Sequence, residues 1–169
     1  MGENEQTMGA DGPKQKPGVQ SQIQVNAQYV KDLSFENPNA PQMLTSDKPP
    51  EIDVSVDVGA RLMESSQFEV ELRITVSAMV ESKKAFVAEV MYGGVFTFVN
   101  IEDKAIKPVC LIECPRLLFP FARRIIADCI RDGGYPPLLL EPFDFGALYA
   151  NSQSSAETAK TDAPVGVEE

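Results

Sequence analysis

The sequence contains no histidine and no tryptophan, and only three of its 169 residues are cysteine. Without histidine the chain can form neither a Ser-His-Asp triad nor a Cys-His dyad, and no imidazole can bind a metal ion. No nucleophile stands beside a base, and the paired glycines Gly93 and Gly94 do not complete a phosphate-binding motif. We therefore predict that the protein is not an enzyme and has no catalytic residue, metal or cofactor.

The sequence also lacks an apolar run near the roughly 20 residues that a membrane-spanning helix requires. Its first residues, 1–24, are polar and have no apolar core of the kind found in secretory signals. We therefore expect a cytoplasmic protein that does not insert into membranes. In a reducing compartment, Cys110, Cys114 and Cys129 should be free thiols, packed as small apolar side chains.

Positive charge is scarce, because 15 lysines and arginines stand against 25 acidic residues and give a net charge of -10. Such a chain is a poor ligand for nucleic acid and for anionic membranes. We expect any charged partner to be basic. Most of the excess negative charge of the central region falls within residues 32–89.

Both ends of the chain lack the apolar residues needed to build a core. Residues 1–21 are rich in glycine, proline and polar side chains, and residues 150–169 consist mainly of serine, alanine, threonine and glutamate. We predict that these two segments are disordered, the second as an acidic tail. One folded domain is therefore expected over residues 22–149, long enough to bury a core.

Apolar and polar residues alternate over residues 52–58 and 68–78, which predicts strands with one face on a core and the other in water. An earlier segment, 23–35, alternates in the same way, and we place Tyr29 on its core-facing row. Lys31 interrupts this row, which predicts a twist, a bulge or a solvated edge at that point.

A fourth strand is predicted over residues 85–92, where both faces are largely apolar. Gly93 and Gly94 follow, before an apolar segment at 95–99, and they predict a bulge or a sharp bend. The connection 37–50 is proline-rich and too long for a hairpin, so it can cross from one edge of the sheet to another place. The later strands have short links and should be antiparallel neighbours.

The second half of the domain has a helical pattern. We predict a short helix over 102–111, a longer one from Pro115 to Asp132, and a last short one from Asp144 to Tyr149. The apolar stripe of the longer helix is wider than one sheet contact requires. It indicates either a well-buried core helix or a helix between its own sheet and a second subunit. Strands followed by helices predict an α+β fold, an antiparallel sheet with helices on one face.

The polar face of this sheet is acidic but includes apolar side chains. We expect its carboxylates, Glu69 and Glu71 among them, to be solvated. A flat acidic face with an apolar spot suits docking of a basic partner, and a face that only keeps the protein soluble is the alternative. The residues of the face are Asp32, Asp53, Asp57, Glu69, Glu71, Val87, Glu89 and Met91.

Five runs of the sequence carry a resemblance in order and spacing. They are YVKDLSFENPNAP at 29–41, GGVF at 93–96, CPRLLFPFAR at 114–123, GYPPL at 134–138 and FGALY at 145–149. Together they resemble the SecB family of bacterial protein-export chaperones. The resemblance covers residues 22–150, which is the whole predicted domain.

This resemblance implies an ATP-independent chaperone that is not an enzyme. It would bind unfolded precursor proteins, keep them competent for translocation and deliver them to the SecA ATPase. The implied fold is a four-stranded antiparallel sheet with helices packed on one face. The implied assembly is a homotetramer, a dimer of dimers with the long helices at the tetramer interface. The alternative is a general holdase or a toxin-antitoxin-associated chaperone on the same fold.

The resemblance also implies two binding sites. SecA, through a basic and zinc-bearing C-terminal segment, would dock on Asp32, Glu36, Val87 and Glu89. Unfolded clients would bind in grooves between the long connection, nearby strand residues and the last helix. The residues implied for these grooves are Met43, Leu44, Leu62, Met63, Phe143, Leu148 and Tyr149.

Overall fold

The computed structural model describes residues 20–161, and for residues 65 and 155–161 it describes the backbone alone. Nearly all of the predicted N-terminal extension, 1–21, lies outside the described residues. Within the described range the strands are β1 (Gln22–Glu36), β2 (Glu51–Leu62), β3 (Phe68–Val80) and β4 (Lys83–Val99). The α-helices of that range are α1 (Asp103–Pro108), α2 (Cys114–Asp132) and α3 (Phe145–Thr161).

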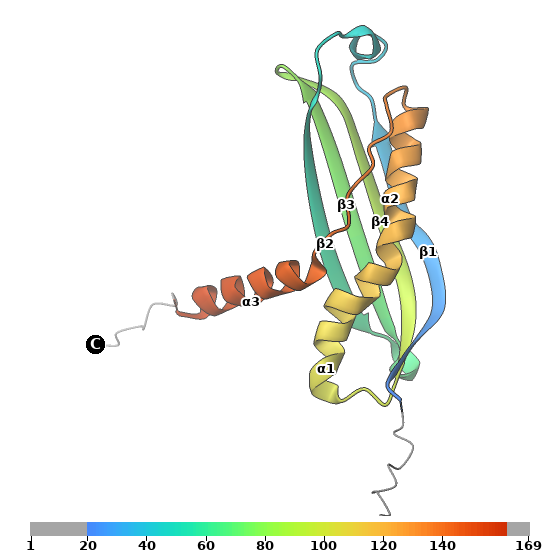
Figure 1. Ribbon diagram of the computed structural model, residues 1–169, viewed down its shortest axis with the longest axis vertical. Coiled ribbons are helices and arrows are strands. Elements are labelled where there is room, and N and C mark those ends of the chain that lie inside the picture. The colour runs from blue at the N-terminus through green and yellow to red at the C-terminus, as the bar shows by residue number, and fades with distance from the viewer. Residues whose placement is uncertain (1–19, 162–169) are drawn as a thin grey trace, which may run out of the picture.

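The four strands form one antiparallel sheet in the order β1-β4-β3-β2. The long connection after β1 carries the chain from one edge of the sheet to the opposite edge, and it includes a short 3-10 helix, Gln42–Thr45. α2 lies across one face of the sheet (Figure 1). We call this side the helix face and the other side the open face. The predicted α+β fold is confirmed.

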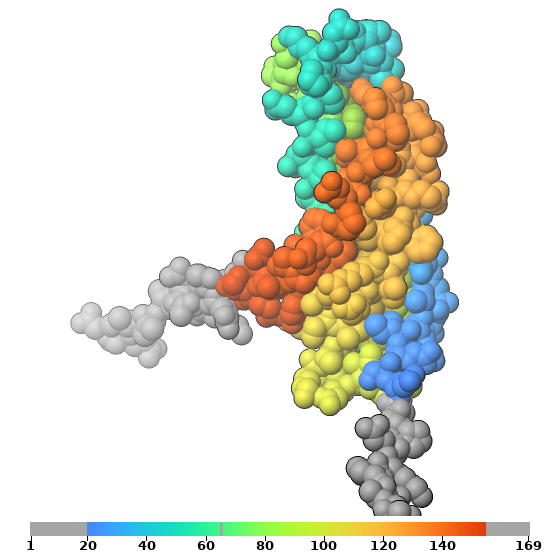
Figure 2. Space-filling model, viewed as in Figure 1, coloured from blue at the N-terminus to red at the C-terminus, as the bar shows by residue number. Residues whose placement is uncertain are grey.

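The core lies between α2 and the two central strands. Alternate residues of β3 are fully buried on the helix face, and the apolar stripe of α2 packs against them. The segment that follows α2 lies beside it on the same side (Figure 2). The buried residues of β3 and α2 in this layer include Val70, Leu72, Ile74, Val76, Ala78, Leu118, Ala122, Ile126 and Ile130.

Gly93 and Gly94 do not interrupt β4, and the bulge predicted there is wrong. The register of β4 with both of its neighbours continues through them without a shift. A Cβ atom on Gly93 would lie 2.9 Å from the ring of Tyr29, and one on Gly94 would lie 2.7 Å from Phe96 and 2.8 Å from Leu118. The two glycines therefore make room for large side chains on the two faces of the sheet.

The irregularity in this part of the sheet lies in β1 instead. Its register against β4 shifts around Asn26 and again around Lys31. The shift at Lys31 was predicted from the broken apolar row. The shift at Asn26 was not predicted. Because of it, the prediction that Tyr29 faces the core is wrong: the Tyr29 ring lies over Gly93 on the open face.

The helical region from residue 103 to residue 132 is continuous, so the predicted break before Pro115 is wrong. One turn of π-helix, Val109–Glu113, joins α1 to α2, and the Cys114 N–H donates to the carbonyl of Val109. This turn shifts the hydrogen-bond pattern just before Pro115, which has no N–H to donate. Pro120 also lies inside α2.

α3 begins as predicted and ends later. The Ala147 N–H donates to Oδ1 of Asp144 at 2.9 Å, which confirms Asp144 as the cap. The helix continues to Thr161 rather than ending near Tyr149, so the expected boundary at residue 150 falls inside it. Alanine and glutamate favour helix even where little is buried. Figure 1 shows α3 leading away from the sheet; residues 162–169 lie outside the described range.

Two glycine substitutions should separate steric crowding from strand propensity. Gly94→Ala places a Cβ atom against two fully buried neighbours, so we expect the free energy of unfolding to fall by about 1–3 kcal/mol. Gly59→Ala on β2 has no atom within 4 Å of the new Cβ and should be neutral or slightly stabilising. Urea unfolding at equal protein concentration measures both. Equal midpoints for the two variants would contradict this account of Gly94.

Candidate functional site

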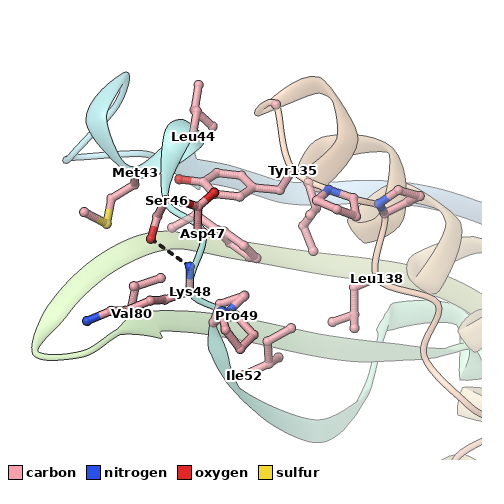
Figure 3. Close-up of a pocket in the computed structure, with 16 residues that line it drawn as sticks. Met43, Leu44, Ser46, Asp47, Lys48, Pro49, Ile52, Val80, Tyr135 and Leu138 are labelled. Atoms are coloured by element: carbon pink, nitrogen blue, oxygen red, sulfur yellow. Dashed lines mark hydrogen bonds between the residues drawn. The ribbon is translucent and has the colours of Figure 1, made fainter.

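An apolar cavity of about 530 Å³ lies where the connection from β1 to β2 meets the segment that follows α2 (Figure 3). Leu44 and Ile52 stand at its rim with 42% and 44% of their surface exposed. The apolar or aromatic residues of its wall come from both connections, the strands and the end of α2. They are Met43, Leu44, Pro49, Pro50, Ile52, Val80, Phe86, Ile130, Tyr135, Pro136, Pro137 and Leu138.

Two aromatic rings fix one wall of this cavity. The ring centres of Phe86 and Tyr135 are 4.8 Å apart. The Tyr135 hydroxyl lies 3.0 Å from Oδ1 of Asn37 and 3.2 Å from the carbonyl oxygen of Ala85, and burial raises its pKa. The Asn37 side chain also donates to the carbonyl of Gly133 at 3.1 Å. The end of β1 and the turn after α2 are therefore held together at this wall.

Gly134 shapes the turn that leads from α2 into the cavity. Its φ of 91° lies in the left-handed region that favours glycine. A Cβ atom there would lie 3.1 Å from Leu44. The turn thus lets the segment with Tyr135 lie close to the rim residue Leu44.

The structure places the predicted client-binding residues at several sites rather than one. Met43 and Leu44 line the cavity of Figure 3. Leu62 lines a second cavity of about 580 Å³ beside α1, together with Phe68 and Ile106. Both cavities adjoin β2, which is an edge strand.

The remaining predicted residues lie between or beside these cavities. Leu148 and Tyr149 line a small hollow of about 130 Å³ against Val56 of β2. The ring of Phe143 packs 5.3 Å from that of Phe145, between ring centres. Met63 is half-buried and its N–H donates to the carbonyl of Gln67 at 2.7 Å.

Sequence reasoning missed the aromatic wall of the cavity in Figure 3. Tyr135 and Phe86 are 49 residues apart in the sequence, and no local pattern joins them. A signal was present in Pro136 and Pro137, because two prolines shortly after the end of a helix hold the chain extended.

The open face brings the four predicted docking residues together. Asp32 pairs with Met91, and Glu36 pairs with Val87, across the β1–β4 ladder. Glu89 lies between Val87 and Met91 on the same face of β4. Adjacent strands are about 4.8 Å apart, so these side chains form one surface. We call Asp32, Glu36, Val87, Glu89 and Met91 the docking face.

Glu89 differs from the acids on β1 because it is bound by its own chain. Nη1 of Arg73 donates to Oε1 of Glu89 at 2.7 Å, and the Thr75 hydroxyl donates to Oε2 at 3.0 Å. Asp32 and Glu36 are exposed. The docking face therefore carries two exposed carboxylates at its β1 edge and one paired carboxylate on β4.

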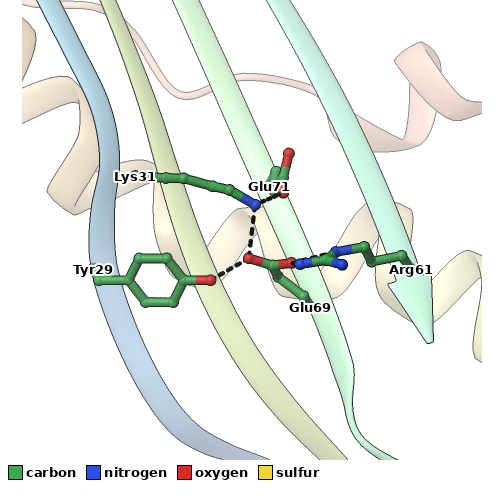
Figure 4. Close-up of polar contacts among 5 residues, drawn as sticks. All are labelled: Tyr29, Lys31, Arg61, Glu69 and Glu71. Atoms are coloured by element: carbon green, nitrogen blue, oxygen red, sulfur yellow. Dashed lines mark hydrogen bonds and ion pairs between the residues drawn. The ribbon is translucent and has the colours of Figure 1, made fainter. Parts of the chain in front are cut away.

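Glu69 corrects the expectation of a solvated carboxylate, since only 2% of its side chain is exposed. Tyr29 and Lys31 of β1 both donate to Oε1 of Glu69, and Arg61 of β2 binds Oε2 (Figure 4). Lys31 also binds Glu71. We call these five residues the Glu69 cluster. It links both edge strands to the central strand β3.

The hydrogen bonds of the cluster control its ionisation. The bond from Tyr29, with those from Lys31 and Arg61, lowers the pKa of Glu69 to about 2 against the opposing effect of burial. Burial and the neighbouring Glu69 raise the pKa of Tyr29. Glu69 is therefore a carboxylate, and Tyr29 a hydroxyl donor, throughout the neutral range.

Other chemistry is sparse in the part of the chain that the structure describes. Within residues 20–161 no three acidic, cysteine or histidine side chains are placed to hold a metal ion. No helix of that range is both long and apolar enough to cross a bilayer. Cys110, Cys114 and Cys129 are free, as predicted, and burial raises the pKa of Cys114 to about 12. These thiols are therefore protonated at neutral pH.

Replacing Glu69 should change how stability depends on pH. The lowered pKa means that the ionised carboxylate stabilises the fold above pH 4.5, and that this contribution is lost as pH falls towards 2. Glu69→Gln should therefore lower the free energy of unfolding by about 1–3 kcal/mol at pH 7, and the difference from wild type should shrink between pH 5 and pH 3.

Urea unfolding over that pH range measures this effect. Glu51→Gln, at an exposed position of β2, is the matched control and should change stability by less than about 0.5 kcal/mol. A difference between Glu69→Gln and wild type that stayed constant from pH 7 to pH 3 would contradict the assigned ionisation.

The sequence matches a family model described as preprotein translocase subunit SecB over residues 16–156. It is 50% identical to the protein-export protein SecB of Parvibaculum lavamentivorans over 143 residues, which cover 84% of this chain and 85% of the relative. It is 52% identical to the protein of the same name from Paramagnetospirillum magneticum over 130 residues, covering 76% and 83%.

A solved structure supports the same fold. The SecB-like chaperone Rv1957 of Mycobacterium tuberculosis, solved with a peptide from the HigA1 antitoxin, superposes with a TM-score of 0.55 at 16% identity, covering 72% of this chain and 91% of that one. At this identity the likeness concerns the fold. The match over most of the length, the high identity and the shared sheet-and-helix architecture confirm the predicted resemblance: this chain belongs to the SecB family.

Proposed function

We propose that this protein is an ATP-independent chaperone of protein export. It binds unfolded precursor proteins, keeps them competent for translocation and delivers them to SecA, and it works in the cytoplasm. The observation that carries the proposal is the apolar cavity at the end of the sheet, with exposed Leu44 and Ile52 at its rim. Relatives about 50% identical are named protein-export proteins, whereas the antitoxin-associated chaperone shares the fold at 16% identity.

The cavity has the chemistry of a site that accepts many sequences. Its wall is mostly aliphatic and aromatic, and Met43 supplies a flexible, polarisable side chain that adapts to different partners. Apolar side chains of an unfolded chain would be taken from water at this wall, which is favourable whatever their order. Binding of this kind needs no nucleotide.

We place the client path along β2, from this cavity to the second one at Leu62. β2 is an edge strand, so its outer backbone groups are available to an extended chain. Leu148 and Tyr149 line the hollow between the two cavities, and Met63 directly follows β2 at the Leu62 end of the path. An extended client segment would thus find apolar side chains at several points.

We propose further that the chain forms a homotetramer, a dimer of dimers. α2 buries one apolar face on the sheet, yet Leu117 and Phe121 on the same helix are 42% and 45% exposed. The Phe121 ring stacks 6.0 Å from Tyr92, between ring centres. These side chains support the interpretation of α2 as a helix between its own sheet and a second subunit.

SecA docking is assigned to Asp32, Glu36, Val87 and Glu89 on the docking face. Exposed carboxylates attract a basic segment and speed its encounter, and Val87 offers an apolar contact. This face lies on the side of the sheet opposite to α2. Delivery to SecA would therefore leave the client site accessible.

Leu44→Asp should weaken client binding, because it places a charge at the rim of the apolar cavity. We expect the wild-type protein to suppress light scattering by a chemically unfolded precursor without nucleotide, and the variant to need about tenfold more protein for the same effect. Leu44→Met keeps an apolar side chain of similar volume and should behave as wild type. The proposal would be contradicted if Leu44→Asp suppressed light scattering as well as wild type, or if the wild-type protein required ATP.

Native mass spectrometry tests the assembly. The wild-type mass should be near four times the 18.5 kDa of the chain. Phe121→Glu puts a charge on the exposed face of α2 and should shift the mass to dimers or monomers. Leu139→Glu, at a position 73% exposed and outside α2, is the control and should leave the mass unchanged. A monomeric wild-type chain at micromolar concentration would disprove the tetramer.

A further inference from the structure

Arg73 is a basic residue in the middle of an acidic surface. In the register of the sheet it lies in one row with Asp32 and Met91 on one side and Asp57 on the other. Two other bases of this face, Lys31 and Arg61, are bound within the Glu69 cluster. A third, Lys84, lies at the far end of β4, opposite Met79. Arg73 therefore stands apart from them, at the docking face itself.

The contacts of Arg73 are with a docking residue. Its Nη1 donates to Oε1 of Glu89 at 2.7 Å, while the Thr75 hydroxyl occupies Oε2 at 3.0 Å. Both carboxylate oxygens of Glu89 thus have a partner from the same chain. Among the described residues, neither Asp32 nor Glu36 forms an ion pair.

A basic partner that reaches Glu89 must replace Arg73 there. The Arg73 side chain is 42% exposed and that of Glu89 is 25% exposed, so the pair is open to solvent and to an incoming cation. Ion pairs with this exposure contribute little to stability, which makes the exchange easy. The displaced guanidinium would remain near the partner and repel its positive charge.

We propose that Arg73 is an internal competitor that tunes docking of the basic partner. The Arg73 guanidinium forms an ion pair with Glu89 in the free protein, and it must be displaced from Glu89 when the partner binds. This inference rests on the docking function proposed above. Because Arg73 lowers the attraction for any single cation, it favours partners that combine several bases with an apolar contact to Val87 and Met91.

Arg73→Gln removes the competing charge and should strengthen docking. We expect purified SecA to bind this variant about threefold to tenfold more tightly than wild type at low salt, with faster association and a steeper loss of affinity as salt rises. Lys104→Gln makes the same change in net charge on α1, at a side chain that is 84% exposed, and should alter the affinity by less than about twofold. Circular dichroism and native mass confirm that each variant is folded and assembled.

A double-mutant cycle shows whether Arg73 acts through Glu89. In a Glu89→Gln background, Arg73→Gln should change SecA affinity by less than about twofold, because the competed carboxylate is gone. Arg73→Lys keeps the charge beside Glu89 and should bind SecA within about twofold of wild type. A general effect of net charge would instead persist in the Glu89→Gln background.

Two results would overturn the inference, and they differ in what they leave standing. If Asp32→Lys weakens SecA binding but Arg73→Gln binds no more tightly than wild type, the docking face stands and the role of Arg73 is wrong. If wild type and Asp32→Lys bind SecA equally well, or neither binds, the docking assignment fails and the inference fails with it.

Discussion

Packing of α2 on β3 and β4 decides which side of the sheet is apolar and which is left to solvent. The even-numbered residues of β3 from Val70 to Ala78 are fully buried on the side that α2 covers, and this leaves the odd-numbered row to form the open face. The open face then needs polar contacts to hold its edge strands. The Glu69 cluster supplies them, because one buried carboxylate binds β1 through Tyr29 and Lys31 and β2 through Arg61.

The alternation within single strands was enough to predict the covered face of β2 and β3. The lengths of the connections predicted the antiparallel neighbours and the crossing of the long connection. Alternation was not enough for Glu69, whose burial requires side chains from two other strands and a register shift at Asn26 that returns Tyr29 to the open face. The role of Gly93 also depends on this register shift, because the lack of a side chain at Gly93 matters only when the Tyr29 ring lies above it. Such features depend on pairing between strands, which no local pattern encodes.

The two candidate binding sites also differ in how much of each could be predicted from the sequence. Alternation along β1 and β4 was enough to place Asp32, Val87 and Glu89 on the open face, whereas Glu36 and the docking role itself came from the family resemblance. The resemblance also supplied Met43 and Leu44, but it did not supply the rest of the apolar cavity, because Phe86 and Tyr135 meet by tertiary packing. The result is a molecule with an apolar site on the helix side, at the end of the sheet, and an acidic site on its open face.

This separation is the central claim of the account, and a binding competition tests it most directly. SecA is titrated against the protein alone and against the protein saturated with a short, unfolded, apolar peptide. If the two sites are independent, the affinity for SecA should agree within about twofold in the two titrations, and peptide, protein and SecA should form a ternary complex. Displacement of the peptide by SecA, in proportion to the SecA bound, would contradict two separate sites.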